Sequence, residues 1–138
     1  MKFKLNIEPP TVTAQEHKVK VVHGRPMFYD PPKVRHAKGV LSEALMVHTP
    51  LEPLTGPVEL RAVWKFKRSR PHRHGEWRTT RPDTDNLQKL LKDIMTGLGF
   101  WNDDAQVVRE SVEKMWSNDP GLEIEITELE AQSDNTTG

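Results

Sequence analysis

Two pairs of aspartates flank one short segment of the chain. Asp83 and Asp85 precede a run of helix-forming residues, and Asp103 and Asp104 follow it. If folding brings the pairs together, their charges repel, and protonation or a hard cation with oxygen ligands, such as Mg²⁺, relieves the repulsion. Ions bound in this way activate water and stabilise the leaving oxygen in phosphodiester cleavage. The four carboxylates are therefore candidates for a metal-dependent hydrolytic site.

Each pair also has an ordinary structural interpretation. Asp83 or Asp85 alone is more often a helix cap, because an aspartate oxygen there accepts a hydrogen bond from a free backbone N–H. The segment Asn102–Asp104 alone is typical of a turn before a strand. The combination favours a site, particularly with Lys89 nearby, because a lysine there can offset negative charge that develops on a phosphate.

The residues between the two pairs predict the helix that joins them. Lys89 lies on its outward face, and Asp85, four residues earlier, shares that face. Gly97 and Gly99 suit the left-handed backbone that ends a helix, so the chain can return through Phe100–Trp101. The opposite face carries one apolar stripe at helical spacing, which belongs to the core: Leu87, Leu90, Leu91, Ile94, Met95 and Leu98.

Charge is distributed unevenly, although the net charge is zero. Residues 1–81 carry 16 Lys and Arg against 7 Asp and Glu, whereas residues 103–138 carry 2 against 10, so the first part is the candidate for an anionic partner. The densest basic run, Lys65–Pro82, leads directly into the first aspartate pair. Such a run contacts phosphates, and its Trp77 can stack on a base or pack under the loop. A plain solvated loop is an equally good interpretation.

Composition bounds the class of protein. A chain of 138 residues fits a single domain. It has no apolar run near the roughly 20 residues of a membrane span, and the segment Met1–Pro10 lacks the apolar core of a signal peptide. We therefore expect a soluble protein of the cytoplasm without a membrane partner. The absence of cysteine excludes a disulfide framework, a thiolate zinc site and a cysteine nucleophile.

The remaining segments predict an α+β domain. Residues 34–48 suit a helix, with Val40, Leu41, Ala44, Leu45 and Val47 on or near one face, and turn residues around His23–Pro26 predict a hairpin. Strands are expected at Phe3–Pro9, Pro57–Lys67, Gln106–Ser117 and Leu122–Glu130.

The arrangement of these elements can also be predicted. The turn Asn118–Gly121 separates the last two strands, which predicts that they form an antiparallel hairpin. We expect one small domain over residues 1–130, in which a mixed or antiparallel sheet packs against two helices on one face. Residues 131–138 contain no core-forming side chain and are expected to be a disordered tail.

The run Arg81–Lys89 followed by Gly99–Val108 resembles, in order and spacing, the signature of the RusA family of Holliday-junction resolvases. The resemblance is strong over residues 81–108, extends over about 57–128 and is weak before residue 57. It implies a RusA-like fold and a small homodimeric, Mg²⁺-dependent endonuclease, often encoded by a phage or prophage. Such an enzyme cuts symmetric strands of four-way DNA junctions in recombination and repair, in a bacterial or phage-infected cell.

The resemblance also assigns residues to roles. By position, it implies that Asp83, Asp85, Lys89 and Asp104 form the active site, and that its three aspartates bind one or two Mg²⁺, with Mn²⁺ as an expected substitute. For Asp103, in the adjacent acidic position, we expect a supporting structural role. The candidate contacts with the DNA backbone are Lys67, Arg68, Arg70, Arg73, Arg78 and Arg81.

Two alternatives remain open. The same site can serve a Mg²⁺-dependent nuclease that acts on other branched DNA, such as flaps or replication forks. A module that binds branched DNA without cutting it is the other alternative. A missing acid or lysine would favour that module, and the sequence fills every active-site position.

Overall fold

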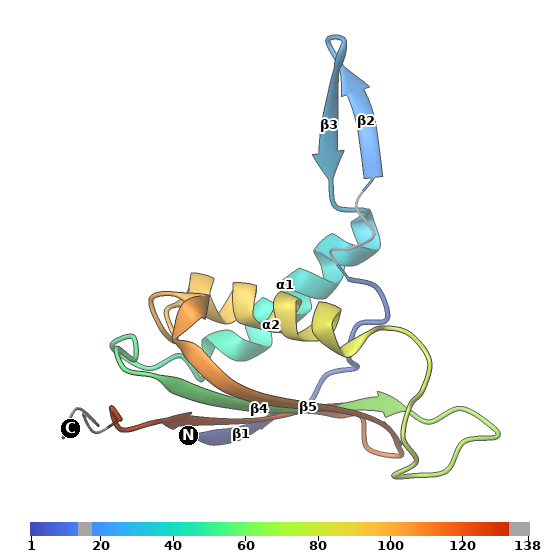
Figure 1. Ribbon diagram of the computed structural model, residues 1–138. Coiled ribbons are helices and arrows are strands. Elements are labelled where there is room, and N and C mark those ends of the chain that lie inside the picture. Colours follow the sequence, from blue (N-terminus) through green and yellow to red (C-terminus); the bar gives the residue numbers. More distant parts are fainter. Residues whose placement is uncertain (14–17, 133–138) are drawn as a thin grey trace, which may run out of the picture.

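The computed structural model describes residues 1–13 and 18–132. Both helices lie against the same face of a four-stranded sheet (Figure 1), which confirms the predicted α+β class. Within the described residues, no helix is long and apolar enough to cross a membrane. The elements in chain order are β1 (Lys2–Leu5), β2 (Lys18–Val22), β3 (Arg25–Tyr29), α1 (Pro32–Met46), β4 (Val58–Lys67), α2 (Thr84–Leu98), the short 3₁₀ helix η2 (Asp104–Gln106), β5 (Val107–Ser117) and β6 (Gly121–Glu128).

The sheet is mixed and has the order β1-β6-β4-β5. Strand β4 pairs in parallel with β5 and antiparallel with β6, so the predicted hairpin between β5 and β6 is wrong. The physical reason is burial: β4 buries every second side chain and is suited to a place between two neighbours, whereas the first half of β5 is largely exposed, as in an edge strand. The turn before β6 therefore carries the chain across β4.

The core lies between the sheet and the two helices. The stripe predicted for α2 is confirmed, because Leu87, Leu90, Leu91 and Met95 are buried and the rest of the stripe is half-buried. Each such side chain stabilises the fold by about 1.5–3 kcal/mol when it is fully buried. The strands contribute these buried side chains: Leu5, Val58, Leu60, Ala62, Trp64, Phe66, Trp116, Leu122, Ile124 and Ile126.

Helix α1 and strand β1 have boundaries that differ from the prediction. Helix α1 begins two residues earlier than expected, because Pro32 at its start needs no hydrogen bond for its nitrogen, and it also ends two residues earlier. Val47 is its C-cap and is 80% exposed, so it does not face the core as predicted. Strand β1 ends at Leu5 instead of Pro9, because Leu5 pairs with Leu122 near the first residue of β6 and no partner remains beyond it.

The predicted hairpin is confirmed as β2 and β3, which stand away from the sheet in Figure 1. A two-residue turn joins them, and His23 and Gly24 in this turn have φ angles of 51° and 75°. Positive φ at both positions matches the right-handed twist of paired strands. Of the predicted tail, residues 133–138 lie outside the described part of the chain.

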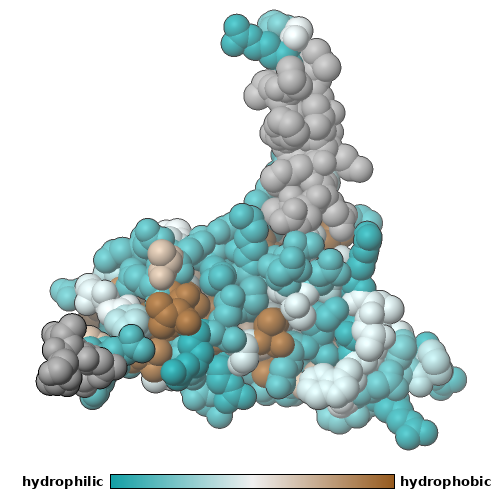
Figure 2. Space-filling model, viewed as in Figure 1, coloured by the Kyte–Doolittle hydropathy of each residue, from teal (hydrophilic) through white to brown (hydrophobic). Residues whose placement is uncertain are grey.

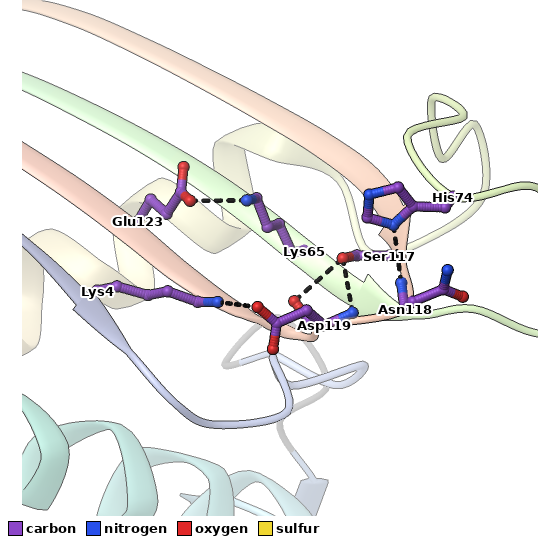
Figure 3. A network of polar contacts seen from close by, with 7 residues as sticks. All are labelled: Lys4, Lys65, His74, Ser117, Asn118, Asp119 and Glu123. Carbon is purple, nitrogen blue, oxygen red and sulfur yellow. Dashed lines mark hydrogen bonds and ion pairs between the residues drawn. The ribbon is translucent and has the colours of Figure 1, made fainter.

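A polar network closes the turn between β5 and β6 (Figure 3). The Ser117 hydroxyl accepts a hydrogen bond from the Asp119 backbone N–H at 2.9 Å and donates one to the Asp119 carbonyl at 3.0 Å. Lys4 of β1 donates to the Asp119 carboxylate at 2.6 Å, and the Asn118 backbone N–H donates to Nδ1 of His74 at 3.0 Å. The turn is thereby tied both to β1 and to the loop after β4, residues 68–82, which we name the basic loop.

Candidate active site

The first aspartate pair lies at the start of α2. Asp83 is the N-cap residue, as the sequence allows, but its exposed carboxylate makes no capping hydrogen bond. Asp85 lies exposed in the first turn, where the helix dipole favours negative charge. The helix therefore begins without using the Asp83 carboxylate as a cap.

The chain turns back at the end of α2. Gly99 adopts the predicted left-handed backbone, with φ of 93°, whereas Gly97 remains within the helix. The Phe100 backbone N–H donates to the Met95 carbonyl at 3.0 Å, and the side chains of Phe100 and Trp101 are buried in the core. This return brings η2, with the second aspartate pair, against α2.

Asp103 is used in the local fold of this return. Its carboxylate caps η2 by accepting the Ala105 backbone N–H at 2.8 Å. The side chain of Gln106 completes a capping box by accepting the Asp103 backbone N–H at 3.0 Å, and its amide group donates to the carbonyls of Leu54 and Gly56. The segment before Asp104 is thus fixed to the loop that precedes β4.

Asp104 is half-buried and held by a chain of hydrogen bonds. The Thr96 hydroxyl donates a hydrogen bond to its Oδ1, and the indole Nε1 of Trp101 donates to the same hydroxyl at 2.7 Å. Asp93 lines the same pocket as Asp104. Burial raises the pKa of Asp93, hydrogen bonding to Asp104 and the negative charge of Asp104 raise it further, and the charges of Lys89 and Lys38 oppose these effects.

One pocket of about 490 Å³ brings most of the predicted site together. It gathers Asp85 from the first turn of α2, Lys89 from the outward face of this helix and Asp104 from η2. Asp83 does not line this pocket. The complete lining is Thr84, Asp85, Gln88, Lys89, Lys92, Asp93, Asp104, Glu110 and Val112.

The sequence prediction missed two acids of this pocket. Asp93 lies four residues after Lys89, so helical spacing alone places it on the same face. Glu110 reaches the pocket only because β5 pairs in parallel with β4, which the predicted hairpin concealed. It accepts hydrogen bonds from the buried Gln88 at 3.2 Å and from Lys92 at 3.3 Å, which fix its position beside α2.

The donor types in the pocket suit a hard cation. Asp85, Asp93, Asp104 and Glu110 all offer carboxylate oxygens, which Mg²⁺ prefers. Within residues 1–13 and 18–132, however, no three acidic or histidine side chains lie close enough to form a metal-ligand set. The chemistry of the donors therefore fits Mg²⁺, and binding requires these side chains to draw together.

Contacts between β5 and the segment before α2 position Asp83. We name residues 75–82 the strap, because residues 75–78 run antiparallel along the end of β5 and the remainder leads into α2. Lys114 of β5 donates to the carbonyls of Thr80 and Pro82 at 2.8 and 2.7 Å. Burial and the nearby Arg78 lower the pKa of Lys114, and the charge of Asp83 opposes them. Lys114, which the sequence did not single out, thus anchors the residue that precedes Asp83.

Most predicted DNA contacts are exposed, with one exception. Arg78 is half-buried, and its guanidinium lies 4.3 and 4.5 Å from the ring centres of Phe66 and Trp116. It also donates two hydrogen bonds to the Arg81 carbonyl, so its side chain stabilises the strap. The exposed members of the predicted set are Lys67, Arg68, Arg70, Arg73 and Arg81.

The fold and the pocket together define a small α+β protein with a carboxylate-lined site beside an exposed basic loop. The model of the family described as endodeoxyribonuclease RusA matches residues 8–127, and the chain belongs to this family. The family predicted from the two aspartate motifs is thus confirmed.

Individual relatives agree with this assignment. The chain is 33% identical over 129 residues to the crossover junction endodeoxyribonuclease rusA of Lactococcus phage r1t, which covers 92% of this chain and 97% of the relative. It is 30% identical over 142 residues to the uncharacterized protein YqaN of Bacillus subtilis strain 168, covering 95% and 98%. A shorter stretch of 50 residues is 54% identical to the crossover junction endodeoxyribonuclease RusA of Escherichia coli K12, covering 36% and 42%.

Proposed function

We propose that this protein is a Mg²⁺-dependent crossover junction endodeoxyribonuclease that hydrolyses a phosphodiester bond in each of two opposed strands of a four-way DNA junction. The observation that carries the proposal is the pocket that gathers Asp85, Lys89 and Asp104 in a chain of the RusA family. The relatives from Lactococcus phage r1t and Escherichia coli, which are named as such endonucleases, support it.

The aspartates and the lysine of the site have different proposed roles. Asp83, Asp85 and Asp104 would hold one or two Mg²⁺, and Mn²⁺ is expected to substitute because it also takes oxygen ligands. When bound, the ion supplies a water of lowered pKa and positive charge beside the phosphate. Lys89, exposed on the same helical face as Asp85, offsets negative charge on the phosphate as the bond to the leaving oxygen breaks.

The basic loop brings the DNA to this site. Lys67, Arg68, Arg70 and Arg73 precede the strap and Arg81 lies within it, so phosphates bound to these residues lead towards the start of α2. Such contacts fix the position of the duplex without reading its sequence, and added salt weakens them.

Symmetric cutting requires two active sites on opposed strands, and we therefore propose a homodimer. A DNA substrate is met in the cytoplasm of a bacterium or a phage-infected cell, so we propose that the protein acts there. Sedimentation velocity at micromolar concentration tests the dimer, and a protein that remains monomeric with junction DNA present would contradict paired incision.

A comparison of substrates tests the activity. The wild-type protein is incubated with a synthetic four-way junction, a flap and a linear duplex, each with Mg²⁺ or with EDTA. We expect symmetric nicks on the junction alone, and only with Mg²⁺. Preferential cutting of the flap would instead support a nuclease for other branched DNA. Junction binding without cutting, with either Mg²⁺ or Mn²⁺, would support a binding module and contradict the proposal.

A further inference from the structure

One tryptophan of the chain is placed unlike the others. Trp64, Trp101 and Trp116 are 0%, 1% and 8% exposed, whereas Trp77 of the strap is 60% exposed. An indole gains much from burial, because it is the largest apolar side chain. The exposure of Trp77 therefore does not serve the packing of the domain.

The backbone around Trp77 is held firmly. The Gly75 backbone N–H donates to the Trp116 carbonyl at 2.8 Å, the Trp116 N–H donates to the Glu76 carbonyl at 2.8 Å, and the Arg78 N–H donates to the Lys114 carbonyl at 3.0 Å. Hydrogen bonds to β5 thus bracket the tryptophan on both sides. A side chain presented from ordered backbone loses less entropy when it binds a partner.

The surroundings of Trp77 are positive. Arg70, Arg73 and Arg81 are exposed near it in the sequence, and Glu76 is the one acid of the run Lys65–Pro82. Glu76 lies 2.5 Å from Nδ1 of His72, and this hydrogen bond lowers its pKa, so its charge is engaged within the loop. The loop projects beyond the end of the sheet (Figure 1), and its surface is hydrophilic in the same view (Figure 2).

The position of Trp77 matches the reach of a DNA substrate. Trp77 lies eight residues before Asp85, which lines the pocket, a separation of at most about 29 Å for an extended chain. One turn of duplex DNA spans about 34 Å. A DNA strand with a phosphate at the pocket can therefore place a base near the indole. Bases inside a duplex are stacked on both sides, whereas bases at a branch point, where stacking is interrupted, can offer a free face at lower cost.

We propose that Trp77 stacks on the face of a base that is exposed at the branch point and so favours branched DNA over plain duplex. A basic segment that presents an exposed aromatic ring suits a nucleotide, because the arginines can bind the phosphate while the base covers the ring. The inference rests on the proposed function and adds to it a residue that recognises the branch. Arginine contacts to phosphates do not provide this distinction, because every duplex has phosphates.

Tryptophan fluorescence gives a direct test, because the other three indoles are buried. Wild-type protein is titrated with the four-way junction in EDTA, which prevents cutting. We expect the junction to quench the emission of Trp77 and to protect it from acrylamide, and duplex of the same length to do so far less. The Trp77→Phe variant should lose this signal while it keeps most of the junction affinity, because a phenyl ring still stacks.

Affinity measurements separate stacking from charge. We expect Trp77→Ala to bind the junction roughly 5- to 150-fold more weakly, with a much smaller loss on duplex. Its dependence of affinity on salt should stay as in the wild type, whereas Arg73→Ala should reduce the salt slope by about 1. The matched control is Leu51→Ala, which removes a fully exposed apolar side chain outside the basic loop and should leave junction affinity unchanged.

The outcomes distinguish this inference from the proposed function. If the wild-type protein cuts the junction, but Trp77→Ala binds it equally well and the emission does not change, only the stacking proposal is overturned. If the junction quenches Trp77 but no cutting occurs, stacking stands and the proposed activity fails. A Trp77→Ala protein that changes from dimer to monomer in sedimentation would assign the indole to the subunit contact and overturn the inference. Absence of junction binding by the wild type would overturn both.

Discussion

The hydroxyl group of Thr96 connects Asp104 to Trp101, because it donates to the carboxylate of the first and accepts from the indole of the second. Trp101 is buried in the core, so the orientation of the Asp104 carboxylate depends on core packing. The fold itself therefore orients the Asp104 carboxylate.

Replacing Thr96 by valine tests this connection. Valine keeps the shape of threonine but removes the hydroxyl, and we expect the rate of junction cutting to fall roughly 10- to 100-fold, as is common when a partner of a metal-binding residue is lost. Thr96→Ser keeps the hydroxyl and should retain most of the rate. Equal rates for Thr96→Val and wild type in single-turnover assays would show that Asp104 does not depend on this contact.

The carboxylates at the two ends of α2 should be needed for cutting and dispensable for binding. Asp83→Asn, Asp85→Asn and Asp104→Asn each remove one negative charge with little change of shape, and we expect cutting to fall at least about 100-fold while gel shifts still show junction binding. Asp103→Asn is the matched control, because asparagine can also cap η2. Cutting by Asp83→Asn at the wild-type rate would place the metal site elsewhere.

Lys114 should stabilise both the fold and the position of the segment that precedes Asp83. Lys114→Met removes two hydrogen bonds to the strap carbonyls, and we expect the free energy of unfolding to fall by about 1–3 kcal/mol and the cutting rate to fall with it. Urea unfolding and single-turnover cutting measure the two effects. The exposed Lys2→Met is the control. A Lys114→Met protein with unchanged stability and rate would show that the strap holds its place without the lysine.

The contact between Lys4 and Asp119 predicts a dependence of stability on pH. The hydrogen bond from Lys4 holds the pKa of Asp119 below its ordinary value of 3.8, so the folded protein binds that proton more weakly than the unfolded chain. The ionised Asp119 therefore makes its full contribution to the stability of the folded protein above the ordinary pKa. This contribution is lost as the pH falls through the lowered pKa.

Thermal unfolding of wild type and Asp119→Asn, followed by circular dichroism from about pH 7 to about pH 2, measures this contribution. We expect a small difference in Tm near neutral pH, because Asp119 is exposed, and convergence of the two proteins in acid. A difference that stays constant over the whole range would contradict the assignment.

The sequence predicted what depends on local spacing. The apolar stripe of α2, the outward direction of Lys89 and the turn at Gly99 follow from helical periodicity and backbone preference, and the structure agrees with all three. Asp93 was equally accessible to this reasoning, since it shares the face of Lys89, but no motif drew attention to it.

What the sequence did not predict depends on pairing between distant segments. A turn such as Asn118–Gly121 is compatible with a hairpin or with a crossing over a third strand, and only the burial of β4 between two neighbours decides between them. The roles of Glu110 and Lys114 follow from that pairing. The interaction of Arg78 with Phe66 and Trp116 likewise requires the strap to lie along β5.

The parallel pairing of β4 and β5 has a consequence for how the site is lost. Their connection, residues 68–106, contains the strap, α2 and η2, so every predicted active-site residue lies between two strands that must find each other across a long loop. Closing such a loop costs entropy that only the completed sheet repays. We therefore expect the chain to acquire the site late in folding and to lose it when the edge strand detaches. Denaturant should then abolish activity and sheet structure in one cooperative transition.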